Sequence, residues 1–143
     1  MTLRGDITRE ILNERGRSFF PGHMGIEVLA VTPGRVHARM PVQPHLLAPN
    51  GFLHAASIIA LADTACGYGT IAHLPEGAQS FTTIELKSNF LGTATEGTLV
   101  CEALNEHGGR TTQVWDALVT HEATGRRIAL FRCTQMILWP KEA

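Results

Sequence analysis

The order of hydrophobic and polar positions divides the chain into helical and extended stretches. Residues 6–17 are strongly charged, with a few apolar residues at helical spacing, which predicts a short surface helix. Residues 26–31 are apolar and β-branched, and residues 35–40 alternate between polar and apolar. Because the turn-forming pair Pro33-Gly34 lies between these two stretches, we expect them to form a β-hairpin.

The second half of the chain is extended in character. Four strand-like stretches follow a break at Pro75 and Gly77, and they cover residues 80–91, 98–105, 110–121 and 127–138. The short loops between the last three predict an antiparallel meander. Strands grouped around one helix, in place of strands that alternate with helices, favour an α+β fold.

The longest apolar stretch lies between the two groups of strands, after a loop over residues 41–53. It runs from His54 to about Ala72 and has apolar residues at helical spacing. Ile59 and Tyr68 widen the apolar surface beyond one stripe. The pattern predicts a buried helix, which an antiparallel sheet would cover.

Composition narrows the class of protein. A length of 143 residues predicts one domain over 1–143. With 12 Lys and Arg against 13 Asp and Glu, the chain lacks the charge of a general nucleic-acid binder. The N-terminus has no apolar signal core, and no apolar run approaches the ~18 residues that span a bilayer. We therefore expect no nucleic-acid or membrane partner.

The spacing of the cysteines and histidines argues against a disulfide-linked protein and a metal-binding protein. Cys66, Cys101 and Cys133 are distant from one another and form no CxxC pair, which argues against a disulfide framework and favours the cytoplasm. The seven histidines show no HxH or HExxH spacing. We expect neither a metal nor a cofactor.

One carboxylate stands out in the apolar stretch. Asp63 is the only charged residue between His54 and Ala72. An ionised carboxylate in a buried helix costs several kcal/mol unless it is paired. Asp63 is therefore functional, or bonded to hydroxyls such as that of Thr64, or on a face of the helix that water reaches. Free N–H groups at the start of the same helix favour an anion or a polarised carbonyl. His54 at this start is either functional or a helix cap, and Asn50-Gly51 forms the turn before it.

The spacing of these groups bears on assembly. Asp63 follows Ala55 by eight residues, which is roughly 12 Å along a helix. A carbonyl bound at the N–H of Ala55 therefore cannot touch Asp63 of the same helix. If both groups serve one reaction, two copies of the helix must lie roughly antiparallel, as a two-fold dimer provides.

Residues 47–65 resemble the signature of hotdog-fold acyl-CoA thioesterases, closest to the phenylacetate-pathway and 4-hydroxybenzoyl-CoA type. Their signature is a glycine, a His-Gly-Gly, six further residues and a carboxylate. The matching residues here are Gly51, His54, Ala55, Ala56 and Asp63. The resemblance covers nearly the whole chain. It implies a sheet of five or six antiparallel strands wrapped around one long helix, with subunits in dimers or tetramers.

The resemblance also implies roles for individual residues. The N–H of Ala55 would polarise the thioester carbonyl, and Asp63 of the partner subunit would be nucleophile or general base. Ala48 stands where many relatives carry Asn or Gln, and Asn50 is a nearby substitute. Arg110, Arg126 and Arg127 flank predicted turns, where they could meet the phosphates of CoA.

A hydroxyl on the strand after the helix is a further candidate. Thr83 matches the position of a Ser or Thr that assists in some relatives. Strand alternation, however, places Thr82 on the same face as Ile84 and Leu86, so Thr82 is the better-aimed hydroxyl if the site faces the helix.

Three functions follow from these observations. The first is hydrolysis of an acyl-CoA thioester by a cytoplasmic homo-oligomer. The second is a non-catalytic protein that binds acyl-CoA or another small ligand, for which Ala48 and the missing glycines argue. The third is a dehydratase or hydratase of acyl thioesters, which the spacing of His54 and Asp63 fits less well.

Overall fold

The computed structural model describes residues 1–141. Its helices and strands, in chain order, are α1 (Arg9–Gly16), α2 (Phe20–His23), β1 (Glu27–Thr32), β2 (Arg35–Pro41), the 3-10 turn η1 (Pro44–Leu46), α3 (Ala55–Ala72), β3 (Ser80–Phe90), β4 (Thr98–Gly108), β5 (Thr112–His121) and β6 (Arg127–Leu138). The predicted elements are all present. The chain around Phe20, which the sequence indicated as a turn, forms the one-turn helix α2 because Pro21 stands in its first turn.

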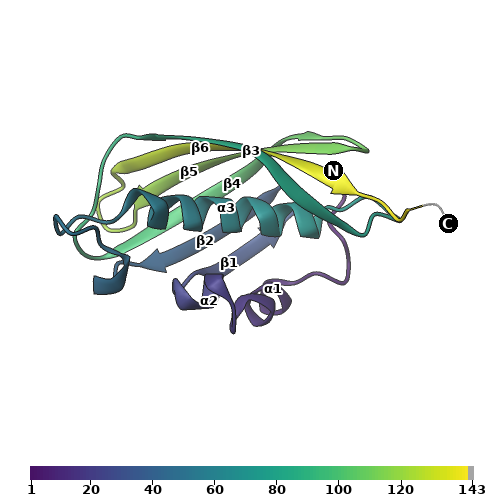
Figure 1. Ribbon diagram of the computed structural model, residues 1–143. Helices are drawn as coiled ribbons and strands as arrows, with labels where there is room; N and C mark the ends of the chain where they lie inside the picture. The colour runs from purple at the N-terminus through teal and green to yellow at the C-terminus, as the bar shows by residue number, and fades with distance from the viewer. Residues whose placement is uncertain (142–143) are drawn as a thin grey trace.

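One six-stranded antiparallel sheet forms the body of the molecule, in the order β1-β2-β4-β5-β6-β3. The expected hairpin is β1-β2, and the expected meander is β4-β5-β6. The sheet lies behind the long helix α3 in Figure 1, and the short helices α1 and α2 lie beside β1. This confirms the predicted α+β hotdog architecture, a sheet around one central helix with a short N-terminal helix.

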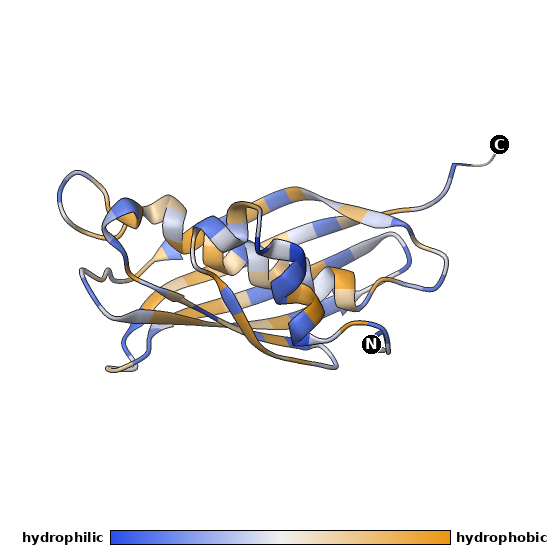
Figure 2. Cartoon of the chain, turned by 90° about the horizontal axis from the view of Figure 1, so that it is seen from below, coloured by the Kyte–Doolittle hydropathy of each residue, from blue (hydrophilic) through white to orange (hydrophobic). Residues whose placement is uncertain are grey.

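Alternation along the strands gives the sheet a buried and an exposed face. In β5, Gln113, Trp115, Ala117 and Val119 are buried, while the residues between them are partly exposed. The same banding of hydrophobic and hydrophilic positions is visible along the strands in Figure 2. The buried face packs on α3, where its side chains and those of the helix form the core.

Small residues let α3 lie close to the sheet. A β-carbon added to Gly69 would lie 2.7 Å from the Trp115 ring, so only glycine fits there. The helix has 18 residues, and by length and composition it could cross a membrane; more than half of it is buried inside the sheet. The expectation that no apolar stretch reaches this length was wrong, because one charge at Asp63 does not interrupt the helix.

Candidate active site

The start of α3 carries one unused backbone donor. His54 is the N-cap, and its Nδ1 accepts a hydrogen bond from the N–H of Ala56 at 2.9 Å. The N–H of His54 itself donates to the carbonyl of Leu46. Among residues 1–141, the N–H of Ala55 has no partner, and Ala55 is exposed. The His54 ring is therefore a helix cap, and it leaves the Ala55 N–H directed away from the helix at its positive end.

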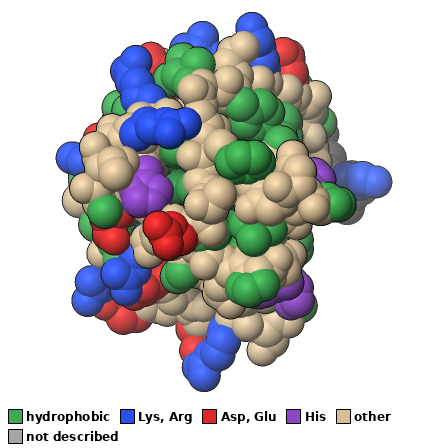
Figure 3. All heavy atoms as spheres, turned by 90° about the vertical axis from the view of Figure 1, so that its left-hand side faces the viewer, with side chains coloured by type: hydrophobic (Ala, Val, Ile, Leu, Met, Phe, Trp, Pro, Cys, Tyr) green, Lys and Arg blue, Asp and Glu red, His purple; other side chains and the backbone are tan. Residues whose placement is uncertain are grey.

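A cavity of about 500 Å³ opens at this point. It is lined by Ala48, Asn50, Phe52, Leu53, His54, Ala55, Ile58, Phe90, Gly92 and Thr93. Asn50 closes the turn by accepting the N–H of Phe52 on its Oδ1, which leaves its NH₂ group available as a donor. Gly51 adopts a φ of 85°, a left-handed conformation that favours glycine. Figure 3 views this end of the molecule, where histidine, acidic and cationic side chains lie around exposed apolar ones.

Asp63 lies in the middle of α3, half-buried and electrostatically unsatisfied. Its Oδ1 is sealed from solvent and has no hydrogen-bond partner among residues 1–141. Burial raises the pKa of the Asp63 carboxyl above its usual range. Buried polar atoms in folded proteins are nearly always paired, so an orphaned carboxylate oxygen marks a candidate functional site.

The side of α3 that carries Asp63 faces the edge strand β3. Gly67 follows Asp63 by one turn, and a β-carbon at Gly67 would lie 3.3 Å from the Phe81 ring of β3. Asp63 is not among the residues that line the cavity at the helix start. A single chain therefore holds the Ala55 donor and the Asp63 carboxylate at separate places, as their spacing predicted.

The orientation of the strand-borne hydroxyl differs from the alternation argument. A β-bulge between Thr83 and Glu85 shifts the register of β3 against β6. Thr83 consequently pairs with the buried Gln135, and its Oγ1 donates to Gln135 Oε1 at 2.7 Å. Thr82 instead lies opposite the exposed Met136. The expectation that Thr82 is the better-aimed hydroxyl was wrong, because the bulge adds a residue to the strand.

The three candidate phosphate-binding arginines do not gather in one place. Arg126 belongs to the β5-β6 turn and lies against Gly92 of the cavity at the helix start. Arg127 lines a groove on the outer face of the sheet. Arg110 stacks on Trp139 at 4.8 Å, beside the β4-β5 turn. Only Arg126 is adjacent to the site.

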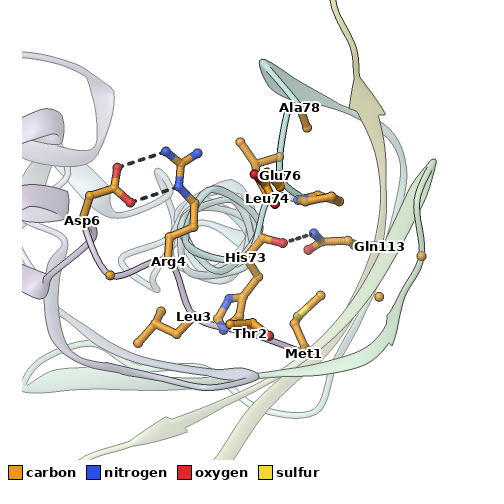
Figure 4. Close-up of a pocket in the computed structure, with 15 residues that line it drawn as sticks. Met1, Thr2, Leu3, Arg4, Asp6, His73, Leu74, Glu76, Ala78 and Gln113 are labelled. Atoms are coloured by element: carbon orange, nitrogen blue, oxygen red, sulfur yellow. Dashed lines mark hydrogen bonds and ion pairs between the residues drawn. The ribbon is translucent and has the colours of Figure 1, made fainter.

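A second cavity, of about 680 Å³, lies at the opposite end of α3 (Figure 4). The N-terminal segment covers it, and Arg4 on its rim is paired with Asp6. Deeper in, Gln113 donates to the carbonyl of His73 at 3.0 Å. Arg4, His73 and Gln113 thus have partners within the chain, and no buried side-chain atom without a partner among residues 1–141 belongs to this cavity.

Other polar groups near the site were not anticipated from the sequence. The hydroxyl oxygen of Thr93 and the Nδ1 of His121 are sealed from solvent without a hydrogen-bond partner among residues 1–141. Gln135 is fully buried and also donates to Cys133 Sγ at 3.3 Å. These three residues lie in a loop and in strands with no motif, so no local signal distinguished them. Within the same residues, no three His, Cys, Asp or Glu side chains are placed to hold a metal ion.

The sequence of the chain is similar to that of a known protein family. The family model described as the thioesterase superfamily matches residues 50–128. The chain is 31% identical over 142 residues to the 1,4-dihydroxy-2-naphthoyl-CoA hydrolase of Escherichia coli, covering 96% of this chain and all of that protein.

Solved structures show the same arrangement. A crystal structure of a Pseudomonas aeruginosa thioesterase, carrying alanine in place of a glutamine, has a TM-score of 0.90 at 25% identity and covers 96% of this chain and 99% of that one. A Staphylococcus aureus thioesterase, also with alanine in place of a glutamine, has a TM-score of 0.78 at 27% identity and covers 82% and 97%. A further structure of that S. aureus protein carries alanine in place of a glutamate. The altered glutamine and glutamate are fifteen positions apart.

Proposed function

Since this chain belongs to the thioesterase superfamily and is a thioester hydrolase, we propose that it cleaves acyl-CoA to free acid and CoA in a site shared by two subunits. The observation that carries this proposal is the Asp63 carboxylate, whose buried Oδ1 has no partner among residues 1–141. The unused Ala55 N–H at the start of α3 is the complementary group. Asp63 Oδ1 is an acceptor that lacks a donor, and the Ala55 N–H is a donor that lacks an acceptor.

The two groups divide the chemistry of hydrolysis. The Ala55 N–H, at the positive end of the helix, would donate to the thioester oxygen as negative charge develops on it. Asp63 would attack the carbonyl carbon directly or take a proton from the attacking water. The carbon–sulfur bond then breaks, the acid is released after addition of water, and the CoA thiolate takes up a proton.

The edge strand β3 supports assembly from two subunits. One long side of β3 pairs with β6, and within residues 1–141 no strand pairs with its other side. Ile84, Leu86 and Phe90 on this strand are 57%, 41% and 45% exposed. An exposed apolar edge strand is a template for pairing with another chain. Pairing of two β3 strands about a two-fold axis would carry the partner's α3 to the side on which Asp63 lies.

A second pairing is proposed through the outer face of the sheet. A groove of about 610 Å³ there includes Leu104, Leu118 and Leu130. Exposed apolar surface of this kind favours protein contact, so dimers would join into tetramers. With three free, buried thiols in the chain, we place this assembly in the cytoplasm.

The relatives support Asp63 as the carboxylate and draw attention to Ala48. In the S. aureus protein, the glutamine and glutamate that were replaced lie fifteen positions apart. Ala48 and Asp63 have the same separation here. We propose that the NH₂ group of Asn50, which lines the same cavity as Ala48, takes the place of the glutamine amide.

The test is thiol release from acyl-CoA by the purified protein and by Asp63→Asn. The panel spans acetyl-, hexanoyl-, palmitoyl-, phenylacetyl-, benzoyl- and 1,4-dihydroxy-2-naphthoyl-CoA. We expect Asp63→Asn to fold and assemble but to lose at least about 1,000-fold in kcat, as for removal of a nucleophile or its base. Glu76→Gln, an exposed carboxylate at the other end of α3, is the control. Full activity in Asp63→Asn would exclude Asp63 from the reaction.

A further inference from the structure

The sheet has two edge strands, β1 and β3, and the structure covers them differently. Within residues 1–141, β1 pairs with β2 alone and β3 pairs with β6 alone. Among these residues no strand pairs with the outer side of β3, whereas helix α1 lies beside β1 (Figure 1). The backbone N–H and C=O groups along the outer side of an edge strand are a template for pairing with another chain. The cover over β1 therefore bears on how copies of this chain assemble.

Asn13 of α1 makes the hydrogen bonds to β1 that a neighbouring strand would make. Its Nδ2 donates to the Val28 carbonyl at 2.9 Å, and its Oδ1 accepts from the Val28 N–H at 2.7 Å. A side-chain amide can take the place of a paired backbone residue because it offers one acceptor and a donor to the same partner. The backbone groups of Val28 that point away from β2 are therefore already bonded within the chain.

Two further features close the same edge. Arg9, in the first turn of α1, donates from Nη1 to the Leu29 carbonyl at 3.2 Å. A β-bulge between Val28 and Ala30 interrupts the register of β1 with β2, and a bulge increases the local twist of a strand. Leu12 of α1 is fully buried in the core, which fixes the helix in this place. A covering helix and a bulge are both devices by which natural sheets prevent pairing between edges.

The blocked edge matters once two subunits have paired through β3. Such a pair would have one continuous sheet, and the two outer edges of that sheet would both be β1 strands. An uncovered β1 would pair with β1 of a further dimer. The contacts β3 to β3 and β1 to β1 would then alternate without closing, and the product would be an open-ended chain of dimers.

We infer that α1 ends the sheet on both sides of the dimer, and that Asn13 and Arg9 keep further copies of this chain from adding through β1. The inference rests on the pairing through β3 in the proposed function. A net hydrogen bond changes an equilibrium by about two- to tenfold. Loss of the three bonds from these side chains to β1 should therefore raise the fraction of chains with α1 detached by about 10- to 1,000-fold.

The double variant Arg9→Ala/Asn13→Ala tests this role of α1. We expect the Val28 N–H to exchange its hydrogen at least about tenfold faster, and the mass in sedimentation to rise with concentration beyond that of a tetramer. Asn13→Asp should act in the same direction, because it keeps the size of the side chain but places an oxygen opposite the Val28 carbonyl. The control Glu14→Ala/Arg17→Ala removes an exposed ion pair of the same helix and should behave as the wild type does.

The same replacements in an Ile84→Lys background separate the two edges. Ile84→Lys places a cation on β3 and blocks pairing there, so the protein with α1 intact should be a monomer. Adding Arg9→Ala/Asn13→Ala should give a dimer that is held through β1. Faster exchange of the Val28 N–H in the single chain, followed by its protection in the dimer, would identify β1 as the contact.

The inference is overturned if Arg9→Ala/Asn13→Ala keeps the wild-type mass at every concentration, whether or not the Val28 N–H exchanges faster. Thiol release per chain by the dimers should stay within about twofold of the wild type, because neither residue lines the cavity at the helix start. Larger assemblies of the double variant, with no thiol release by any of these proteins, would overturn the proposed hydrolysis and leave this role of α1 in place.

Discussion

The ionised carboxyl of Asp63 destabilises the fold, and the same carboxyl is the reactive group of the proposed site. Burial raises the pKa of its carboxyl, so the ionised form is held in the folded protein at a cost in free energy. The other buried titratable groups differ in kind. Hydrogen bonding with Cys133 and burial together raise the pKa of the Cys66 thiol, which remains protonated and inert. Asp63 is thus the carboxyl group of α3 whose raised pKa suits it to take up a proton in a reaction.

The raised pKa of Asp63 predicts a shift in the pH profile of kcat/KM. If ionised Asp63 is required, the acidic limb should lie above the value of about 3.9 that is usual for aspartate. The profile is measured by thiol release between pH 4 and pH 9. An acidic limb at or below that usual value would contradict the role of a buried Asp63.

The raised pKa of Asp63 also predicts that this residue lowers the stability of the folded protein as the pH rises. A group whose pKa is higher in the folded state stabilises the fold below its unfolded pKa, and this stabilisation is lost as pH rises through the folded pKa. At pH 7 Asp63→Asn should therefore melt at a higher temperature than the wild type. The difference should shrink as the pH falls toward 3, which thermal unfolding of both proteins would check.

The NH₂ group of Asn50 can be separated from the turn that Asn50 forms. Asn50→Ala should lower kcat by about 10- to 100-fold, on the scale of losing one donor to the reacting oxygen or water. Adding Ala48→Gln should restore much of this loss, because it supplies an amide to the same cavity. If the double variant is no better than Asn50→Ala, the loss comes from the turn.

Single residues could be predicted from the sequence where their type conflicts with their surroundings. Asp63 was found because it is the only charged residue in a long apolar stretch, and Ala55 because it lies at the start of that stretch. Thr82 was preferred over Thr83 because a regular strand alternates, and nothing in the sequence near Ile84 revealed the bulge. Thr93 and His121 become candidates only when the atoms around them are known.

At the scale of elements, β3 is a strand with one edge that no strand pairs with among residues 1–141. It has 11 residues, and its apolar side chains are more exposed than those of the inner strands. α3 covers the middle of the sheet, so the inner face of β3 is only partly shielded. A second subunit would cover this face and the open edge together.

A charge on this strand should separate the subunits. Ile84→Lys places a cation on the edge, a device by which natural sheets prevent pairing. We expect a folded monomer that has lost about 100-fold or more in kcat/KM, because neither half of the site would be completed. Size-exclusion chromatography with light scattering measures the mass, and Phe19→Lys, a highly exposed residue before α2, is the control. A dimeric, active Ile84→Lys protein would argue against pairing through β3.

The elements themselves were predictable because each has a local pattern. Helical spacing defined α3, and the short turns defined the β4-β5-β6 meander. The place of β3 was not predictable. It pairs with β6, which follows it by two intervening strands, and a sheet order of this kind depends on contacts that no local pattern contains.

At the scale of the whole molecule, the proposed site requires groups from two chains, which mixing of variants can test. Ala55→Pro removes only the N–H donor, since proline is favoured at the first position of a helix and the extended conformation of His54 suits a following proline. We expect this variant to fold and to lose about 100- to 1,000-fold in kcat. Asp63→Asn lacks the other half of the site.

Dimers that combine the two variants contain one complete site. Random mixing by unfolding and refolding should give about a quarter of the wild-type activity, since half of the dimers are mixed and each has one working site of two. Thiol release measures the recovery, and each variant refolded alone gives the baseline. No recovery from the mixture, with mixed dimers shown by differential tagging, would place both groups within one chain.

The order of strands in the sheet also determines when β3 can pair during synthesis of the chain. Arg127, the first residue of β6, leaves the ribosome 37 residues after Phe90, the last residue of β3. At roughly 5–20 residues per second, β3 therefore waits about 2–7 s before β6, the one strand that pairs with it among residues 1–141, has been synthesised. During this interval both of its edges are open and its isoleucine, leucine and two phenylalanines are uncovered. Overproduction of this protein should therefore be limited by aggregation of nascent chains. Slower translation at low temperature would not shorten the wait before β6 is made. A chaperone that binds β3 would protect it during that time.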